Sequence, residues 1–169
     1  GEVGHMALEK DGPVGYGKAG SFEGFCSGGG LRQLGVAKAR QMLDAGLTPS
    51  FCPDEAALSS VTAQRVAECA NAGHEDAIAV YRQCGEMLGR GLAVLVDILN
   101  PERIVLGSIY ARSADLLCDA MNEVMRKECL SSNLSVCEVV PAALTETVGD
   151  LAALTVAMEG MRNSEGGKV

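Results

Sequence analysis

The sequence has no tryptophan, and its three tyrosines and three phenylalanines make up only 4% of the 169 residues. Hydrophobic residues of all kinds still reach 47%, so the core must be built largely from alanine, leucine, valine and methionine. This composition favours helices, because alanine, leucine and methionine rank high in helix propensity. The length is that of one ordinary domain, and we expect a single domain with a sizeable core over residues 1–169.

Positive charge is also scarce. The chain has 14 Lys and Arg residues against 22 Asp and Glu residues, which gives a formal net charge of -8. Such a charge repels the phosphates of nucleic acids and of anionic lipids. We therefore expect this segment to bind neither nucleic acid nor a membrane surface.

Long apolar runs and targeting signals are absent as well. The longest apolar stretch, residues 91–99, is interrupted by Asp97 and is far shorter than the ~20 residues of a membrane-spanning helix. No cationic segment precedes an apolar one at the start of the chain. The first residue is Gly1 instead of methionine, and site-like residues follow at once, so we expect the chain to be part of a longer protein.

The cysteines form no C-x-x-C pair, although the chain has seven of them. An odd number without regular spacing indicates reduced thiols in a cytoplasmic protein instead of a disulfide framework. Cys26 has no partner at ligand spacing and the chain has only two histidines, which argues against a zinc site.

The spacing of apolar residues predicts an alternation of helices and strands after a glycine-rich start. Residues 1–25 are expected to hold strand fragments and loops, and residues 162–169 a frayed tail. One helix is expected between an N-cap at Ser27 and a C′ glycine at Gly46. Further helices are expected over 62–71, 75–99, 113–130 and 145–161, and buried strands over 103–106 and 136–140. The second half of the 75–99 helix is apolar nearly all round and should lie between layers. The alternation predicts an α/β fold with parallel strands.

The opening "GEVGHM" places an acid and an imidazole three residues apart, at Glu2 and His5. Both side chains can exchange hydrogen bonds with a hydroxyl-rich ligand, and Gly4 between them would let such a ligand approach the backbone. The alternative is a solvated loop with an incidental histidine. Glu23 follows a glycine-rich turn as a third candidate ligand; alternatively it is an acid interacting with the dipole of the next helix.

The stretch "IVLGSIYARS" combines a strand, Gly107 and the start of a helix, a geometry in which backbone N–H groups can face a nucleotide. A tight strand-to-helix turn is the alternative. No G-x-x-x-x-G-K-[ST] sequence is present, which excludes a Walker-type phosphate loop from this segment. His74, at a helix boundary among polar residues, is interpreted as a capping or surface residue.

Four segments, taken in order, together resemble the ROK proteins, a group of bacterial sugar kinases, sugar-responsive repressors and related reading frames. "GEVGHM" resembles the family's E-x-G-H sugar motif, and "GPVGYGKAGSFEGFCSGGGL" its glycine- and cysteine-rich loop. "LGRGLAVLVDILNPERIVLGS" resembles the buried helix and strand of the nucleotide lobe, and "PAALTETVGDLAAL" the last strand-to-helix turn. The resemblance covers nearly the whole chain.

The resemblance implies the C-terminal lobe of an actin-like, ribonuclease-H-like ATPase fold, helix-rich, with a mixed sheet flanked by helices. It implies that Glu2, His5 and Glu23 bind sugar hydroxyls, and that Gly107 and Ser108 line the adenine side of a nucleotide cleft. The implied protein is a cytoplasmic, homodimeric kinase of a hexose or an N-acetylhexosamine that uses ATP with Mg²⁺. The alternative is a sugar-sensing transcriptional regulator of the same family.

The family's phosphate-binding D-x-G-G-T loop and catalytic aspartate belong to its N-terminal lobe, and neither is present in this sequence. We therefore expect that lobe as a partner of this segment, and assign no catalytic residue to the chain.

The sequence also departs from the family at its metal loop. Many members bind zinc with a C-x-C-G-x-x-G-C cluster and the motif histidine, but Gly15 and Ser21 stand at the first and third cysteines here, and the second is deleted. We predict a zinc-free loop held by packing and hydrogen bonds, which frees His5 for ligand. On the nucleotide side, Ser108 replaces the second glycine of a pair and Thr145 stands where a glycine is usual.

Overall fold

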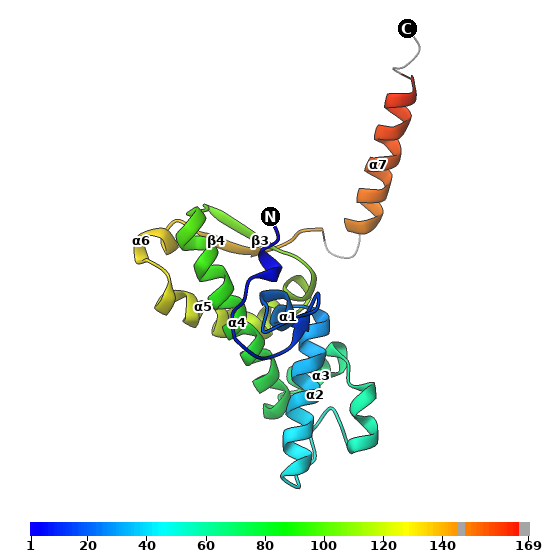
Figure 1. Cartoon of the computed structure of the whole chain (residues 1–169), viewed down its shortest axis with the longest axis vertical. Helices are drawn as coiled ribbons and strands as arrows, with labels where there is room; N and C mark the ends of the chain where they lie inside the picture. Colours follow the sequence, from blue (N-terminus) through cyan, green and yellow to red (C-terminus); the bar gives the residue numbers. More distant parts are fainter. Residues whose placement is uncertain (145–147, 166–169) are drawn as a thin grey trace.

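A computed structural model describes residues 1–144 and 148–165 of the chain (Figure 1). The helices are α1 (Phe22–Cys26), α2 (Gly28–Asp44), α3 (Ala63–Asn71), α4 (Glu75–Leu99), α5 (Ser108–Glu128), α6 (Ser131–Leu134) and α7 (Val148–Glu165), with 3-10 turns η1 (Val3–His5) and η2 (Glu55–Ser60). The strands are β1 (Val14–Gly15), β2 (Lys18–Ala19), β3 (Arg103–Leu106) and β4 (Glu138–Pro141). The expected helix-rich α/β architecture is confirmed. Its strands form an antiparallel pair, β1 with β2, and a parallel pair, β3 with β4.

Helix α4 is the centre of the core, and it packs against α1, α2, α3 and α5. The fully buried side chains are mostly aliphatic or methionine, as the composition predicts: Leu31, Val66, Val80, Leu92, Val96, Leu117, Met121 and Met125. The few aromatic residues are concentrated in the same core. All three phenylalanines and two of the three tyrosines are buried there, whereas the third tyrosine, Tyr16, is 82% exposed.

The close contact between α4 and α5 depends on glycines of α4. A Cβ atom on Gly85 would lie 2.7 Å from the carbonyl oxygen of Leu117, and one on Gly89 would lie 2.6 Å from that of Met121. The backbones of the two helices therefore approach each other more closely than any larger residue at these positions would allow.

The parallel pairing of β3 with β4 is confirmed, with Ile104 opposite Val139. Our expectation that both strands are buried was wrong. Val105 is 60% exposed, while Ile104 and Val139 are half-buried against the core. Uninterrupted apolar strands are typical of parallel sheets covered on both faces, but the described residues cover only one face of this pair.

Two helix predictions also need correction. The helix expected from Ser113 begins five residues earlier, at Ser108, and Ser113 instead marks a break inside it, with a φ of -138°. The last turn of α4 is not enclosed between layers, since Ile98 is 72% and Leu99 is 66% exposed. The start of α5 and the last turn of α4 both adjoin β3. In this region the apolar pattern of the sequence predicts burial, but the described residues leave the side chains of Ile98, Leu99 and Val105 exposed.

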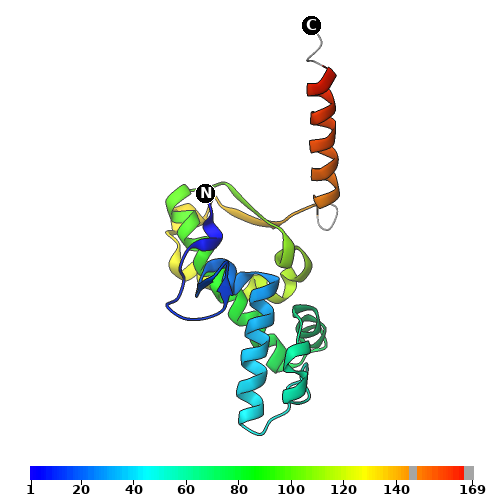
Figure 2. The ribbon, with the colours of Figure 1, turned by 45° about the vertical axis from the view of Figure 1, so that its right-hand side comes forward.

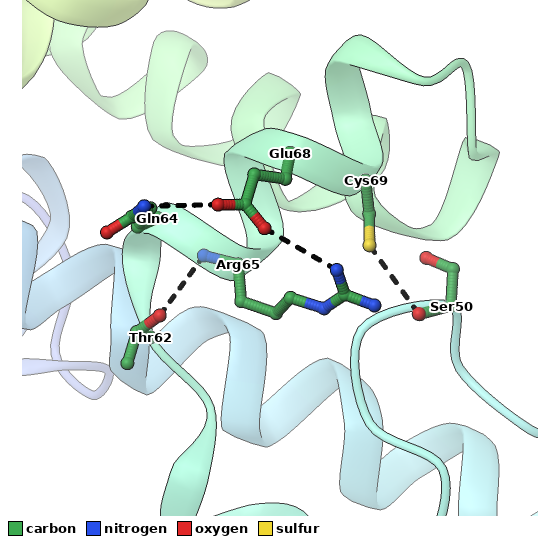
Figure 3. A network of polar contacts seen from close by, with 6 residues as sticks. All are labelled: Ser50, Thr62, Gln64, Arg65, Glu68 and Cys69. Carbon is green, nitrogen blue, oxygen red and sulfur yellow. Dashed lines mark hydrogen bonds and ion pairs between the residues drawn. The ribbon is translucent and has the colours of Figure 1, made fainter.

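Helix α3 and its connection to α2 are stabilised by a chain of polar contacts (Figure 3). Thr62 caps the helix by accepting a bond from the Arg65 N–H at 3.1 Å, and Arg65 pairs with Glu68 one turn later at 3.4 Å. The Cys69 thiol donates to the carbonyl oxygen of Ser50 at 3.5 Å. The first two contacts stabilise the start of α3 itself, whereas the Cys69–Ser50 bond joins the proline-containing connection to the helix.

Helix α7 extends away from the other helices (Figures 1 and 2). Over residues 149–160 its apolar side chains are exposed, among them Leu154 at 60% and Val156 at 72%. The helix reaches Glu165, so the predicted tail shares residues 162–165 with it, while 166–169 and Thr145 lie outside the described residues. No described helix combines the length and the hydropathy that a bilayer span requires.

Candidate functional site

Glu2 and His5 are brought together by the 3-10 turn η1. His5 donates its backbone N–H to the Glu2 carbonyl oxygen at 3.1 Å, and Met6 donates to Val3 at 3.0 Å. Residues three apart in a 3-10 turn lie on the same side, so the carboxylate and the imidazole face the same region. Both side chains are exposed.

Glu23 reaches the same region from the first turn of α1. Ser21 caps this helix: its hydroxyl is fully buried, accepts from the Gly24 N–H at 3.0 Å and donates to the Lys18 carbonyl oxygen at 3.1 Å. The side chain of Glu23 lies over Gly4, where an added Cβ would be 3.2 Å from the Glu23 Cβ and 3.4 Å from Oε2. Gly4 thus leaves room for the Glu23 side chain. That a ligand approaches the Gly4 backbone stays a prediction.

Two cavities meet at Glu23. The first, of about 490 Å³, is lined by Glu2, His5, Tyr16 and Glu23, and we call it the Glu2 cavity. The second, of about 200 Å³, is lined by Glu23, by Gly107 and Ser108, and by apolar residues of α1, α4 and α5. We call it the Gly107 cavity. All five candidate residues from the sequence therefore line two neighbouring cavities that share one carboxylate.

The Gly107–Ser108 turn connects β3 to α5. Ser108 has a φ of +51°, in the left-handed region that favours glycine. A non-glycine residue there costs roughly 1–2 kcal/mol. The turn therefore keeps a glycine-type backbone geometry although its second residue is serine.

The wall of the Gly107 cavity also carries two thiols, those of Cys26 and Cys84. The Cys26 sulfur lies 3.9 Å from the carbonyl oxygen of Cys84. The hydrogen bond with the Cys84 side chain, followed by burial, raises the pKa of the Cys26 thiol far above its usual range. This thiol stays protonated at neutral pH and is no nucleophile. All seven cysteines are free, and within residues 1–144 and 148–165 no three His, Cys, Asp or Glu side chains are grouped to hold a metal ion.

The loop that resembles a metal loop is fastened by hydrogen bonds. The Gln33 side-chain amide of α2 pairs with the backbone of Val14 as a neighbouring strand would: its Oε1 accepts from the Val14 N–H at 2.8 Å, and its Nε2 donates to the Val14 carbonyl oxygen at 3.0 Å. From the other strand, the Lys18 ammonium donates to the His5 carbonyl oxygen at 2.6 Å. The β1–β2 hairpin is thereby tied to α2 on one side and to η1 on the other.

Replacing Gln33 with leucine should loosen this hairpin. The two bonds to Val14 are partly solvated and contribute about 1 kcal/mol each, so we expect the variant to lose about 1–2 kcal/mol of stability. Hydrogen exchange at the Val14 amide should accelerate more than exchange in the core of α4. Gln41→Leu, at an exposed position on the same helix, is the control. Unchanged protection of Val14 in Gln33→Leu would contradict the assignment.

Comparison with known proteins identifies the family. A sequence profile of the ROK family matches residues 1–159. The chain belongs to the ROK family. Its curated relatives include the glucokinase of Thermotoga maritima, 26% identical over 162 residues, which cover 94% of this chain and 49% of that protein. The xylose repressor of Caldicellulosiruptor bescii is 27% identical over 128 residues, covering 75% of this chain and 31% of the repressor.

Solved structures confirm the fold of this ROK chain. A ROK glucokinase from Streptomyces griseus, determined in complex with glucose and AMPPNP, superposes with a TM-score of 0.69 at 22% identity, over 88% of this chain and 48% of that one. The architecture is the actin-like ATPase fold expected from the resemblance. The ROK chain spans about half the length of the glucokinase relatives, or less.

Two residues of the ROK chain's site were missed by sequence reasoning. Gln33 gave no signal, because a glutamine on a helix face is ordinary. Tyr16 lies in the dipeptide Tyr-Gly between two short strands, which is compatible with a two-residue hairpin. Only the structure shows that Tyr16 is exposed while the other aromatic residues are buried.

Proposed function

We propose that the complete protein is a cytoplasmic, ATP-dependent kinase that phosphorylates a hydroxyl of a hexose or an N-acetylhexosamine. The observation that carries the proposal is the position of Glu23, which lines both the Glu2 cavity and the Gly107 cavity. A kinase needs such adjacency, because phosphoryl donor and acceptor must meet in line at short range. Similarity to two glucokinases, one of them solved with glucose and AMPPNP, supports the same function.

In this proposal the carboxylates of Glu2 and Glu23 accept hydrogen bonds from sugar hydroxyls, and the His5 imidazole donates or accepts one. Together they orient the sugar so that one hydroxyl points toward the Gly107 cavity. Gly107 and Ser108 line the adenine side of the nucleotide. Mg²⁺ bound with ATP supplies charge neutralisation on the phosphates. In this proposal the N-terminal lobe supplies the base that takes the hydroxyl proton, and also the phosphate-binding D-x-G-G-T loop, which this sequence does not contain.

A second candidate is a sugar-sensing regulator that binds the sugar without turnover. Similarity to a xylose repressor favours it, and so does the turn at Ser108. There a hydroxymethyl group has been added to a left-handed position in the wall of the Gly107 cavity, which narrows the space for a nucleotide.

An assay of the complete gene product separates the two functions. ADP release is measured with ATP and Mg²⁺ in the presence of glucose, N-acetylglucosamine or N-acetylmannosamine, and binding of the same sugars is measured by calorimetry. A kinase shows ADP release that depends on at least one sugar, with the reaction lacking sugar as the control. Sugar binding without ADP release would reject the kinase and support the regulator. Absence of both would reject the sugar site altogether.

A further inference from the structure

Tyr16 is exposed in a protein that buries its other aromatic side chains. Phe22, Phe25, Phe51, Tyr81 and Tyr110 are each at most 8% exposed, whereas Tyr16 is 82% exposed. Tyrosine is enriched at binding interfaces, where the ring meets a partner and the hydroxyl keeps its hydrogen bond. The position of Tyr16 therefore needs an explanation other than packing.

The backbone at Tyr16 is also held in an unfavourable conformation. Tyr16 and Gly17 form the two-residue loop of the β1–β2 hairpin, in which Gly15 pairs with Lys18 and Val14 with Ala19. Their φ angles are +45° and +74°, and positive φ at both central residues is the requirement of a type I′ turn. Glycine and asparagine satisfy this requirement readily, while a tyrosine is strained there. Strain at a turn that would accept asparagine indicates that the ring itself is needed.

Tyr16 lines the Glu2 cavity together with three residues that have polar side chains, Glu2, His5 and Glu23. Hydrogen bonds restrain the position of the β1–β2 hairpin. Gln33 holds the base of β1, and Lys18 of β2 binds the carbonyl oxygen of His5 itself. The hairpin that carries Tyr16 is thereby tied to α2 and to the turn that carries His5.

This combination fits a pyranose better than any ligand that is polar on all sides. A pyranose ring carries hydroxyls around its edge and C–H groups on its faces, and those slightly positive C–H groups match the negative face of an aromatic ring. Carboxylates and an imidazole match the hydroxyls. We propose that Tyr16 is the stacking platform for one apolar face of the sugar ring that Glu2, His5 and Glu23 hold by its edge. This inference rests on the sugar site of the proposed function and adds a specificity-determining residue to it.

The type I′ turn makes a sharp test available, because Tyr16→Asn should relieve backbone strain while removing the ring. Binding of glucose, N-acetylglucosamine and N-acetylmannosamine to the complete gene product is measured by calorimetry, and thermal stability is measured in parallel. For the sugar that binds tightest, Tyr16→Asn should lower affinity about tenfold, the loss expected for one aromatic contact, with the melting temperature unchanged or raised. Tyr16→Phe keeps the ring and should stay within about twofold of the parent protein. A general weakening of the fold would lower both the sugar affinity and the melting temperature.

Glu2→Gln and His5→Ala distinguish the failure of this inference from the failure of the sugar site. If both weaken sugar binding while Tyr16→Asn retains it within about twofold, the stacking role is wrong and the site stands. If neither weakens binding, or if none of the sugars binds the parent protein, the site is wrong and the stacking role is rejected with it. A lowered melting temperature in Tyr16→Asn would overturn the argument from strain and assign the affinity loss to the hairpin.

Discussion

Glu23→Gln should cost sugar affinity more than any other single substitution in the Glu2 cavity. Glu23 is half-buried and lines both cavities, whereas Glu2 is exposed and lines one. Hydrogen bonds to a charged group contribute about 1.5–3 kcal/mol each when they are shielded from water, so we expect a loss of about 10- to 100-fold in affinity. Exposed Glu2 bonds to sugar in competition with water, and Glu2→Gln should lose less.

The substitution leaves the fold intact, because glutamine has the size of glutamate and can occupy the same space over Gly4. Calorimetric titration with the preferred sugar gives the affinity, and a melting curve checks the fold. Glu55→Gln, an exposed acid in η2, is a matched control that should change neither. If Glu23→Gln binds the sugar within about twofold of the parent protein, Glu23 is not a sugar ligand. The argument that one carboxylate serves both cavities would then fail.

Local signals in the sequence predicted the helices well where each end carries its own chemistry. Ser27 accepts from the Gly30 N–H at 3.0 Å as the N-cap of α2, and Gly46 follows the end of that helix with a φ of +74°. Thr62 caps α3 in the same way. Caps are readable because the side chain and the backbone group that it satisfies are only three residues apart.

Predictions failed where the structure depends on contacts distant in sequence. The start of α5 at Ser108 has no side-chain cap, so periodicity placed the helix at the next serine, Ser113. The burial of β3 was overestimated, because an apolar strand indicates that cover is needed but not whether the described chain provides it. The contact of Glu23 with Gly4 could not be predicted, because the two residues belong to different elements.

The residues of the site also differ in whether local sequence could predict them. Glu2, His5 and Glu23 were found from a motif and its resemblance, and the structure brings them to one cavity. Their supports, Gln33 and Lys18, act across 19 and 13 residues of sequence and were not predictable. A metal-binding loop can be recognised in a sequence by its ligand residues, whereas a loop held by hydrogen bonds from a distant helix has no comparable sequence motif.

Gly30→Ala should destabilise the protein strongly, although its neighbour Gly29 should accept alanine without loss. A Cβ on Gly30 would lie 2.0 Å from the carbonyl oxygen of Gly24 and 3.0 Å from the carbonyl carbon of Phe25, so only a backbone shift can accommodate it. That shift separates α2 from α1, the helix that carries Glu23. We expect a loss of about 2–4 kcal/mol, since backbone overlap cannot be relieved by a change of rotamer.

Gly29 provides the matched control in the same helical turn. Its Cβ would lie 3.7 Å from the Ser27 hydroxyl, an ordinary contact, and the position is exposed. Alanine there should stabilise the protein by about 0.5 kcal/mol, because it lowers the entropy of the unfolded chain and favours the helix. Urea unfolding of both variants measures the difference. Equal shifts would mean that the glycines serve helix propensity alone, whereas opposite shifts would show that the close approach of α2 to α1 requires a glycine at position 30.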